Sequence, residues 1–107
     1  MTVIRLVFAA LKPGAVAAEY EEFERKVDYV VAQKMRTIVS YCTHRITEIG
    51  SGLPGGPWDY VERIEVTDRA AYQAELAVVG KEMLDELYEK YLDRSKTVSV
   101  WSERVEP

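Results

Sequence analysis

His44, the single histidine of the chain, is the side chain best suited to acid–base chemistry. Imidazole gains and loses a proton near neutral pH, so one histidine is enough for a general acid or base. The competing interpretation is a hydrogen-bonded structural histidine on a strand surface. The sequence shows no partner that would decide between the two, so His44 is a candidate catalytic residue.

Cys42 lies two residues before His44, on a segment that reads as a strand. Period-two alternation places both on one face with Ser40, and it places the intervening residues on the other face: Tyr41, Thr43 and Arg45. Which face points inward stays open. Side chains two residues apart on a strand lie about 7 Å apart, too far for a base to bond a thiol. We therefore expect Cys42 to be a small core residue.

Polar and aromatic residues on the central strands are candidates for ligand binding. Arg5, Glu62 and Arg63 would suit a carboxylate or an enolate, although ion pairs at a sheet edge or a dimer interface explain them equally well. Aromatic side chains on strands would suit a flat aromatic ligand, and interfaces favour them too. The candidate ligand-binding residues are Tyr41, Tyr60, Arg63 and Trp101.

Composition and motifs exclude several classes of function. The net charge is −4 with scattered lysines and arginines, which argues against nucleic acid and anionic membranes as partners. One cysteine cannot form an intramolecular disulfide, which favours a reducing compartment and predicts a cytoplasmic protein. One histidine, with no histidine–carboxylate cluster at ligand spacing, argues against a metal site. Dinucleotide, phosphate-loop and catalytic-triad motifs are absent, and we expect no cofactor.

Hydrophobic patterning predicts six elements in one domain of residues 1–107. Val3 to Leu11 reads as a strand rather than a signal-peptide core, because Arg5 interrupts the apolar run. An amphipathic helix follows between Val16 and Met35, and a second helix, capped by Asp68, restarts at Gly80. The other predicted strands are 37–49, 58–66 and 96–105, with the Gly- and Pro-rich segment 50–57 as a flexible hairpin tip.

The order strand, helix, strand, strand, helix, strand is that of the α+β, ferredoxin-like βαββαβ sandwich. Right-handed crossovers put both helices on one face of the sheet and leave the other face bare. Neither face of the first strand is polar. Apolar residues recur along the face that carries Ile4, and most residues of the face that carries Val3 are apolar too. An exposed apolar sheet usually marks an interface, so we expect a homodimer through the sheet face, forming a dimeric α/β barrel.

Several short segments resemble the REDY-like HapK family, within the dimeric α/β-barrel superfamily. They occur in the family's order and spacing and are Lys12-Pro13-Gly14, Tyr20, Phe23, Asp28-Tyr29, Ser40-Tyr41, His44-Arg45, Tyr60-Val61-Glu62 and Val66-Thr67-Asp68. The resemblance spans about two-thirds of the chain and thins out after Leu76. We expect Asp28 and Tyr29 to pin the end of their helix to the sheet.

The resemblance implies a role in secondary metabolism. It favours a barrel that binds a small aromatic or polyketide-like metabolite and assists a cofactor-free condensation, cyclisation or oxygenation, with His44 as acid or base. A non-catalytic accessory or ligand-binding protein is the alternative, favoured by the lack of a base–nucleophile pair. A haem-handling barrel with His44 as axial ligand is the third interpretation.

Overall fold

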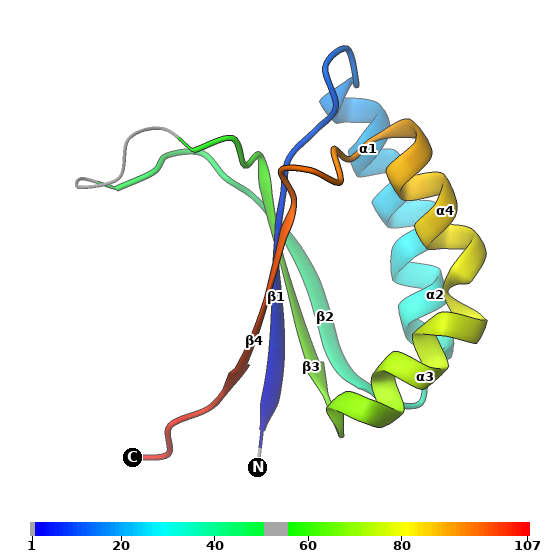
Figure 1. The fold of residues 1–107 in the computed structure, drawn as a ribbon, viewed down its shortest axis with the longest axis vertical. Coiled ribbons are helices and arrows are strands. Elements are labelled where there is room, and N and C mark those ends of the chain that lie inside the picture. Colours follow the sequence, from blue (N-terminus) through cyan, green and yellow to red (C-terminus); the bar gives the residue numbers. More distant parts are fainter. Residues whose placement is uncertain (1, 51–55) are drawn as a thin grey trace.

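The computed structural model describes residues 2–50 and 56–107, which form one layer of sheet covered by one layer of helices (Figure 1). The elements follow the predicted order: β1 (Val3–Ala9), α1 (Ala17–Phe23), η1 (Glu24–Asp28), α2 (Tyr29–Lys34), β2 (Ile38–Arg45), β3 (Tyr60–Val66), α3 (Arg69–Val79), α4 (Lys81–Lys90) and β4 (Val98–Glu103).

The four strands form one antiparallel sheet in the order β2-β3-β1-β4. All the helices lie on one face of this sheet, and the opposite face is uncovered (Figure 1). The predicted ferredoxin-like α+β fold is confirmed. None of the described helices combines the length and the apolar character needed to cross a membrane.

All four predicted strands are longer than the observed ones, and β3 and β4 each begin two residues later than predicted. The first strand was predicted to reach Leu11, but β1 ends at Ala9, and Leu11 forms an isolated bridge with Leu92. The second was predicted to reach Ile49, but β2 ends at Arg45. Most of the predicted flexible hairpin tip, residues 51–55, lies outside the described residues.

A π-helical turn, η1, interrupts the predicted long helix between α1 and α2. The amide of Tyr29 donates to the carbonyl of Glu24, five residues earlier instead of the usual four. Turns of this kind are rare and occur often at functional sites. The two buried residues of η1 are Glu24 and Asp28, so the wide turn carries two carboxylates on the side that faces the sheet.

The second helical stretch begins and restarts where predicted. The carboxylate of Asp68 accepts a hydrogen bond of 2.7 Å from the amide of Ala71, which satisfies a free donor of the first turn. Gly80 separates α3 from α4. A β-carbon at this position would lie 2.6 Å from Cδ1 of Leu76, so the close approach of this side chain favours glycine.

The two faces of the sheet differ in what they contact. Along β3 every second residue is buried, from Tyr60 to Val66, and these residues face the helices. The opposite face is uncovered and apolar on the strands β1 and β4, where Val98 is 42% and Val100 is 40% exposed. The residues of this open face are Ile4, Leu6, Phe8, Ser40, Cys42, His44, Val61, Arg63, Glu65, Val98, Val100 and Ser102.

Candidate functional site

Three carboxylates meet in the interior between the helices and the sheet. Glu24 and Asp28 come from η1 and Glu62 comes from β3. Their exposed fractions are 3%, 4% and 5%, and one oxygen from each lies within 4.8 Å of the other two. Carboxylates are seldom buried this completely without cations or donors beside them, because the charged form loses its hydration. We call these three residues the carboxylate cluster.

The hydroxyl of Tyr41, on β2, lies among all three carboxylates. Its oxygen is 2.6 Å from Asp28 Oδ2, 2.8 Å from Glu62 Oε1 and 3.2 Å from Glu24 Oε1. A phenol has one hydrogen to donate and two lone pairs that can accept. The other carboxyl groups can bond this oxygen only by donating protons of their own. The geometry thus favours a cluster that shares protons rather than three separate anions.

Glu24 has further partners that confirm its fixed position. Its Oε1 accepts hydrogen bonds from Tyr20 at 2.9 Å and from Thr43 at 3.0 Å. Its Oε2 is buried and has no hydrogen-bond partner among the described residues. A buried carboxylate oxygen without a donor is costly, whereas a protonated carboxyl group would turn this atom into a donor.

The surroundings raise the pKa values of the cluster. Burial, reinforced by the charge of Asp28, raises the pKa of Glu62 to about 7. Burial likewise raises the pKa of Glu24 far above its usual range, with hydrogen bonding to Asp28 as the next cause. Burial and the charge of Glu62 raise the pKa of Tyr41, so its hydroxyl stays protonated. Glu62 is therefore a buried carboxylate that exchanges its proton near neutral pH.

The carboxylate cluster borders a small cavity of about 30 Å³, here called the chamber. This volume holds about one water molecule. Its polar side chains are Arg5, Asp28, Tyr41, Glu62 and Tyr72. The rest of the lining is apolar and comes from both layers: Val7, Val31, Ala32, Met35, Ile38, Ile64, Leu76, Met83, Leu84, Leu87 and Tyr88.

A larger and more open groove of about 660 Å³ lies on the other side of Glu24. Its lining is mostly polar and comprises Glu21, Glu24, Arg25, Tyr29, Thr43, His44, Arg45, Thr47 and Tyr60. Glu24 therefore lines the groove, while Asp28 and Glu62 line the chamber. The carboxylate cluster separates the two spaces.

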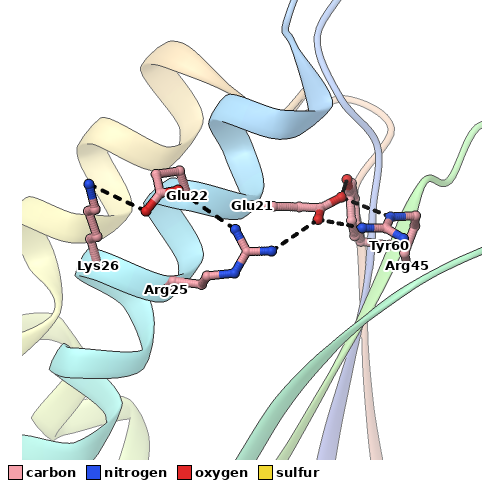
Figure 2. Close-up of polar contacts among 6 residues, drawn as sticks. All are labelled: Glu21, Glu22, Arg25, Lys26, Arg45 and Tyr60. Carbon is pink, nitrogen blue, oxygen red and sulfur yellow. Dashed lines mark hydrogen bonds and ion pairs between the residues drawn. The ribbon is translucent and has the colours of Figure 1, made fainter.

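Glu21 fixes one wall of the groove by joining α1 to two strands (Figure 2). Its carboxylate accepts hydrogen bonds from Nε of Arg45 at 2.9 Å and from the hydroxyl of Tyr60. These bonds, that of Arg45 first, lower the pKa of Glu21 to about 2. Figure 2 also shows Arg25, which forms ion pairs with Glu21 and with Glu22 of α1.

Among the described residues, the three members of the carboxylate cluster are the acidic groups that lie close enough together to hold a metal ion. Oxygens on opposite sides of a bound Ca²⁺ are about 5 Å apart, which fits the 4.8 Å limit of the cluster. The prediction against a metal site rested on ligand spacing between residues that are close in the chain. Glu62 is far from Glu24 in sequence, so that spacing could not reveal the cluster. In this structure Tyr41 already occupies the position among the three carboxylates.

The predicted site residues do not form one site. Tyr41, Tyr60 and Trp101 face the helices, whereas His44 and Arg63 lie on the open face. Tyr41 belongs to the carboxylate cluster, and Tyr60 lines the groove together with His44, which extends from the edge strand. Of the predicted trio for carboxylate or enolate binding, Arg5 and Glu62 line the chamber together.

Arg63 and Trp101 lie outside both the chamber and the groove. Arg63 forms an ion pair with Glu65 at 3.6 Å and donates to Ser40 at 3.3 Å across the open face. Trp101 packs edge to face against Tyr72, with ring centroids 5.7 Å apart. The roles predicted for these two residues and for His44 remain predictions.

Cys42 and His44 differ from their prediction. Sγ of Cys42 lies 3.2 Å from Nε2 of His44, so the expectation that they are too far apart to interact is wrong. The 7 Å spacing describes the backbone positions, whereas both side chains can lean along the strand and close the gap. Cys42 is half-buried on the open face and not in the helix-facing core.

Asp28 and Tyr29 connect the helix to β2, as the sequence predicts. Asp28 accepts from Tyr41, and the hydroxyl of Tyr29 accepts from the amide of Thr43 at 2.8 Å. Glu24 was not among the predicted site residues. One signal was available, because Tyr20, Glu24 and Asp28 are spaced four apart and therefore lie on the apolar face of the helix.

A model of the REDY-like protein HapK family matches residues 3–105. The chain belongs to the REDY-like HapK family. Its Asp28-Tyr29 and Tyr60-Val61-Glu62 segments, through which the resemblance first appeared, both contribute to the carboxylate cluster. No curated protein matches the sequence.

Solved structures share the fold of this HapK-family chain over nearly its whole length. HapK from Hahella chejuensis is 22% identical with a TM-score of 0.70, covering 99% of this chain and 93% of that one. At3g17210 from Arabidopsis thaliana is 14% identical with a TM-score of 0.77, covering 98% and 97%. A dimeric ferredoxin-like protein of unknown function from Jannaschia sp. CCS1 is 14% identical with a TM-score of 0.76, covering 97% and 100%.

Proposed function

We propose that this HapK-family protein binds a small aromatic or polyketide-like metabolite between sheet and helices, and that Glu62 moves a proton on it. The observation that carries the proposal is Glu62 itself, a 5% exposed carboxylate that faces the chamber with its pKa raised to about 7. A base with this pKa is half protonated at neutral pH and can both take and return a proton.

The reaction best matched to such a group is an intramolecular condensation. Glu62 removes a proton from a carbon next to a carbonyl group, and the resulting enolate carbon attacks a second carbonyl carbon of the same molecule. One carbon–carbon bond forms, the electron pair of the second carbonyl moves to its oxygen, and this oxygen takes the proton back from Glu62. The step needs no oxidant or reductant. Tyr41 positions Glu62 through their 2.8 Å hydrogen bond.

The ligand itself needs more room than the chamber offers. A hollow of about 280 Å³ shares Arg5, Tyr72, Leu76 and Leu84 with the chamber, so the two spaces adjoin. In the proposal the body of the ligand lies in this hollow and its reactive carbon points toward Glu62. Trp101, predicted to bind the ligand, lines the same hollow.

The homodimer through the sheet face is part of the proposal. The open face presents apolar residues on β1 and β4, and several structures with this fold are described as dimeric. Two copies packed face to face would bury this surface and form the dimeric α/β barrel. Arg63 and the Cys42–His44 pair lie on that face and would approach the partner copy.

Isotope exchange tests the proton transfer. Acetophenone, an uncharged aromatic ketone, is incubated with the protein in D₂O at neutral pH, and loss of its methyl proton signal is followed by NMR. We expect exchange faster than in buffer, a fall of roughly a hundred-fold or more for Glu62→Gln, and no change for Glu65→Gln. Glu65 is the matched control because it lies on the same strand but on the open face. Equal rates for the two variants would refute the role of Glu62.

His44 is the second candidate for the catalytic group, because it lines the open groove together with Tyr60. His44→Ala should abolish turnover while leaving the dimer intact if the chemistry occurs there. Unchanged exchange in this variant would remove the catalytic role of His44.

The competing function is that of a non-catalytic accessory or ligand-binding protein. The small volume of the chamber favours it, since about 30 Å³ admits little more than a water molecule. A saturable binding isotherm without exchange or product formation would support this alternative.

A further inference from the structure

Two arginines meet at Trp101 without a carboxylate partner. The guanidinium carbon of Arg5 lies 6.0 Å from the ring centroid of Trp101, and that of Arg69 lies 4.7 Å from it. Within residues 2–50 and 56–107, no carboxylate oxygen lies within 4.0 Å of either guanidinium group. In a chain with net charge −4, two unpaired cations at one aromatic ring form a local excess of positive charge.

Arg5 is held in place by neutral groups only. Its Nε donates to the hydroxyl of Ser99 at 2.7 Å and its Nη1 donates to the hydroxyl of Tyr72 at 3.0 Å. These hydrogen bonds orient the guanidinium group but leave its charge without a counter-ion. A guanidinium group held in one orientation can recognise a carboxylate through two parallel, charge-assisted hydrogen bonds.

The hollow beside Arg5 has a volume and a lining suited to an aromatic ring. Its volume is about 280 Å³, close to the lower end of the usual range for small-molecule sites. Tyr72 and Trp101 supply aromatic surface, and Leu76, Ala77 and Leu84 supply aliphatic surface. Arg5 lines both this hollow and the chamber, so its charge lies at the junction of the two spaces.

We propose that the hollow binds an aromatic carboxylate, with the carboxylate on Arg5 and the ring against Tyr72 and Trp101. The inference rests on the proposed function and narrows its substrate class to metabolites that carry an anionic group near the reacting carbon. Pairing at Arg5 would supply a direct carboxylate partner, which the described residues do not place within 4.0 Å of its guanidinium group.

Trp101 reports the binding directly. In a Trp58→Phe protein Trp101 is the remaining tryptophan, and its fluorescence is titrated with benzoate and, separately, with the neutral isostere benzamide. We expect saturable quenching by benzoate and affinity for benzamide at least about ten-fold weaker. Arg5→Gln should weaken benzoate binding by roughly ten- to a hundred-fold while leaving the weak binding of benzamide unchanged.

Arg94→Gln is the matched control. Arg94 also stacks on a tyrosine, with its guanidinium carbon 4.0 Å from the ring centroid of Tyr88, but it does not line the hollow. Its removal should leave benzoate binding unchanged. Equal losses in Arg5→Gln and Arg94→Gln would show a general charge effect and overturn the inference, as would equal affinity for benzoate and benzamide or no saturable benzoate signal.

The acetophenone assay separates this inference from the proposed function. Acetophenone carries no carboxylate for Arg5 to pair with, so exchange by the parent protein and benzoate binding to the parent protein are read as two separate results. Exchange that persists when benzoate fails to bind would overturn the carboxylate site alone. Benzoate binding without any exchange in the parent protein would overturn proton transfer by Glu62 and leave the carboxylate site standing.

Discussion

The hydroxyl of Tyr41 on β2 lies 2.8 Å from Oε1 of Glu62 on the neighbouring strand β3. The bond joins these two neighbouring strands on the face of the sheet that the helices cover, where Glu62 is 5% exposed. Burial and the charge of Asp28 raise the pKa of Glu62, whereas hydrogen bonding to Glu24 and then to Tyr41 lowers it. Tyr41 thereby helps to keep the pKa of Glu62 near neutral pH.

Tyr41→Phe removes the hydroxyl that the three buried carboxylates share. We expect a loss of about 1–3 kcal/mol in the free energy of unfolding, because buried acceptors lose their donor. The pKa of Glu62 should rise further. Urea unfolding at neutral pH measures the stability. Tyr91→Phe is the control, since the hydroxyl of Tyr91 has no hydrogen-bond partner among the described residues; equal losses in both variants would contradict a special role for Tyr41.

Stability should fall as the pH rises through the range in which Glu62 loses its proton. The pKa of Glu62 is about 7 in the folded protein against 4.5 for an ordinary glutamate, so the folded state binds the proton more tightly. Between these two values the free energy of unfolding decreases with increasing pH, by up to about 3 kcal/mol. Urea unfolding across this range measures the slope, and Glu62→Gln should flatten it.

Below this range other carboxylates act in the opposite sense. The pKa of Glu21 is lowered to about 2 by its bonds from Arg45 and Tyr60, and the pKa of Glu75 is lowered by its bonds from Thr37 and Arg36. Their stabilising effect is present above the ordinary glutamate value and is lost as the pH falls through their folded values. Maximum stability is therefore expected on the acid side of neutrality, and a maximum above pH 7 would contradict the assignment.

The sequence predicted the fold because each element has a strong local signal. Alternation defined the strands, and Asp68 and Gly80 marked where the second helical stretch begins and restarts. The apolar series on β1 predicted an uncovered apolar sheet face, and the uncovered face of the sheet carries Leu6 and Val100. These features depend on neighbouring residues, so one sequence is enough to find them.

The candidate site depends on contacts between distant residues and was therefore mostly hidden. Glu24 and Glu62 are brought together only by the packing of η1 on β3. A regular helix was predicted, and the widened turn has no signal in residue types or spacing. Glu24 and Asp28 could have been suspected, because a charged residue on the apolar face of a helix must find partners inside the fold.

Gly80→Ala should destabilise the protein by about 1–3 kcal/mol despite the better helix propensity of alanine. The added methyl group would lie 2.6 Å from Cδ1 and 3.1 Å from the carbonyl oxygen of Leu76, so the Leu76 side chain must move and the backbone between α3 and α4 must shift. The midpoint of thermal unfolding measures the loss. Gly50→Ala, with no atom of the described residues within 4 Å of the new carbon, should change it little, and equal shifts would show that close packing at Gly80 is not the cause.

Leu6→Glu should convert the proposed dimer into a folded monomer. Leu6 lies at the centre of the open face, opposite Val100 on β4 and Arg63 on β3, so a charge there would be buried in a face-to-face dimer. Burial in the interface would take this carboxylate and the neighbouring Arg63 out of water, at a cost of several kcal/mol per ion that can exceed their mutual attraction and dissociate a modest interface. Native mass spectrometry measures the assembly, and circular dichroism checks that the fold is kept.

Val78→Glu is the control for this variant, because Val78 is 80% exposed on the helical side and should not affect assembly. A Leu6→Glu protein that stays dimeric would place the interface elsewhere on the molecule. A monomeric parent protein would leave the apolar residues of β1 and β4 facing solvent, and the proposed barrel would be refuted together with the approach of Cys42 and His44 to a partner copy.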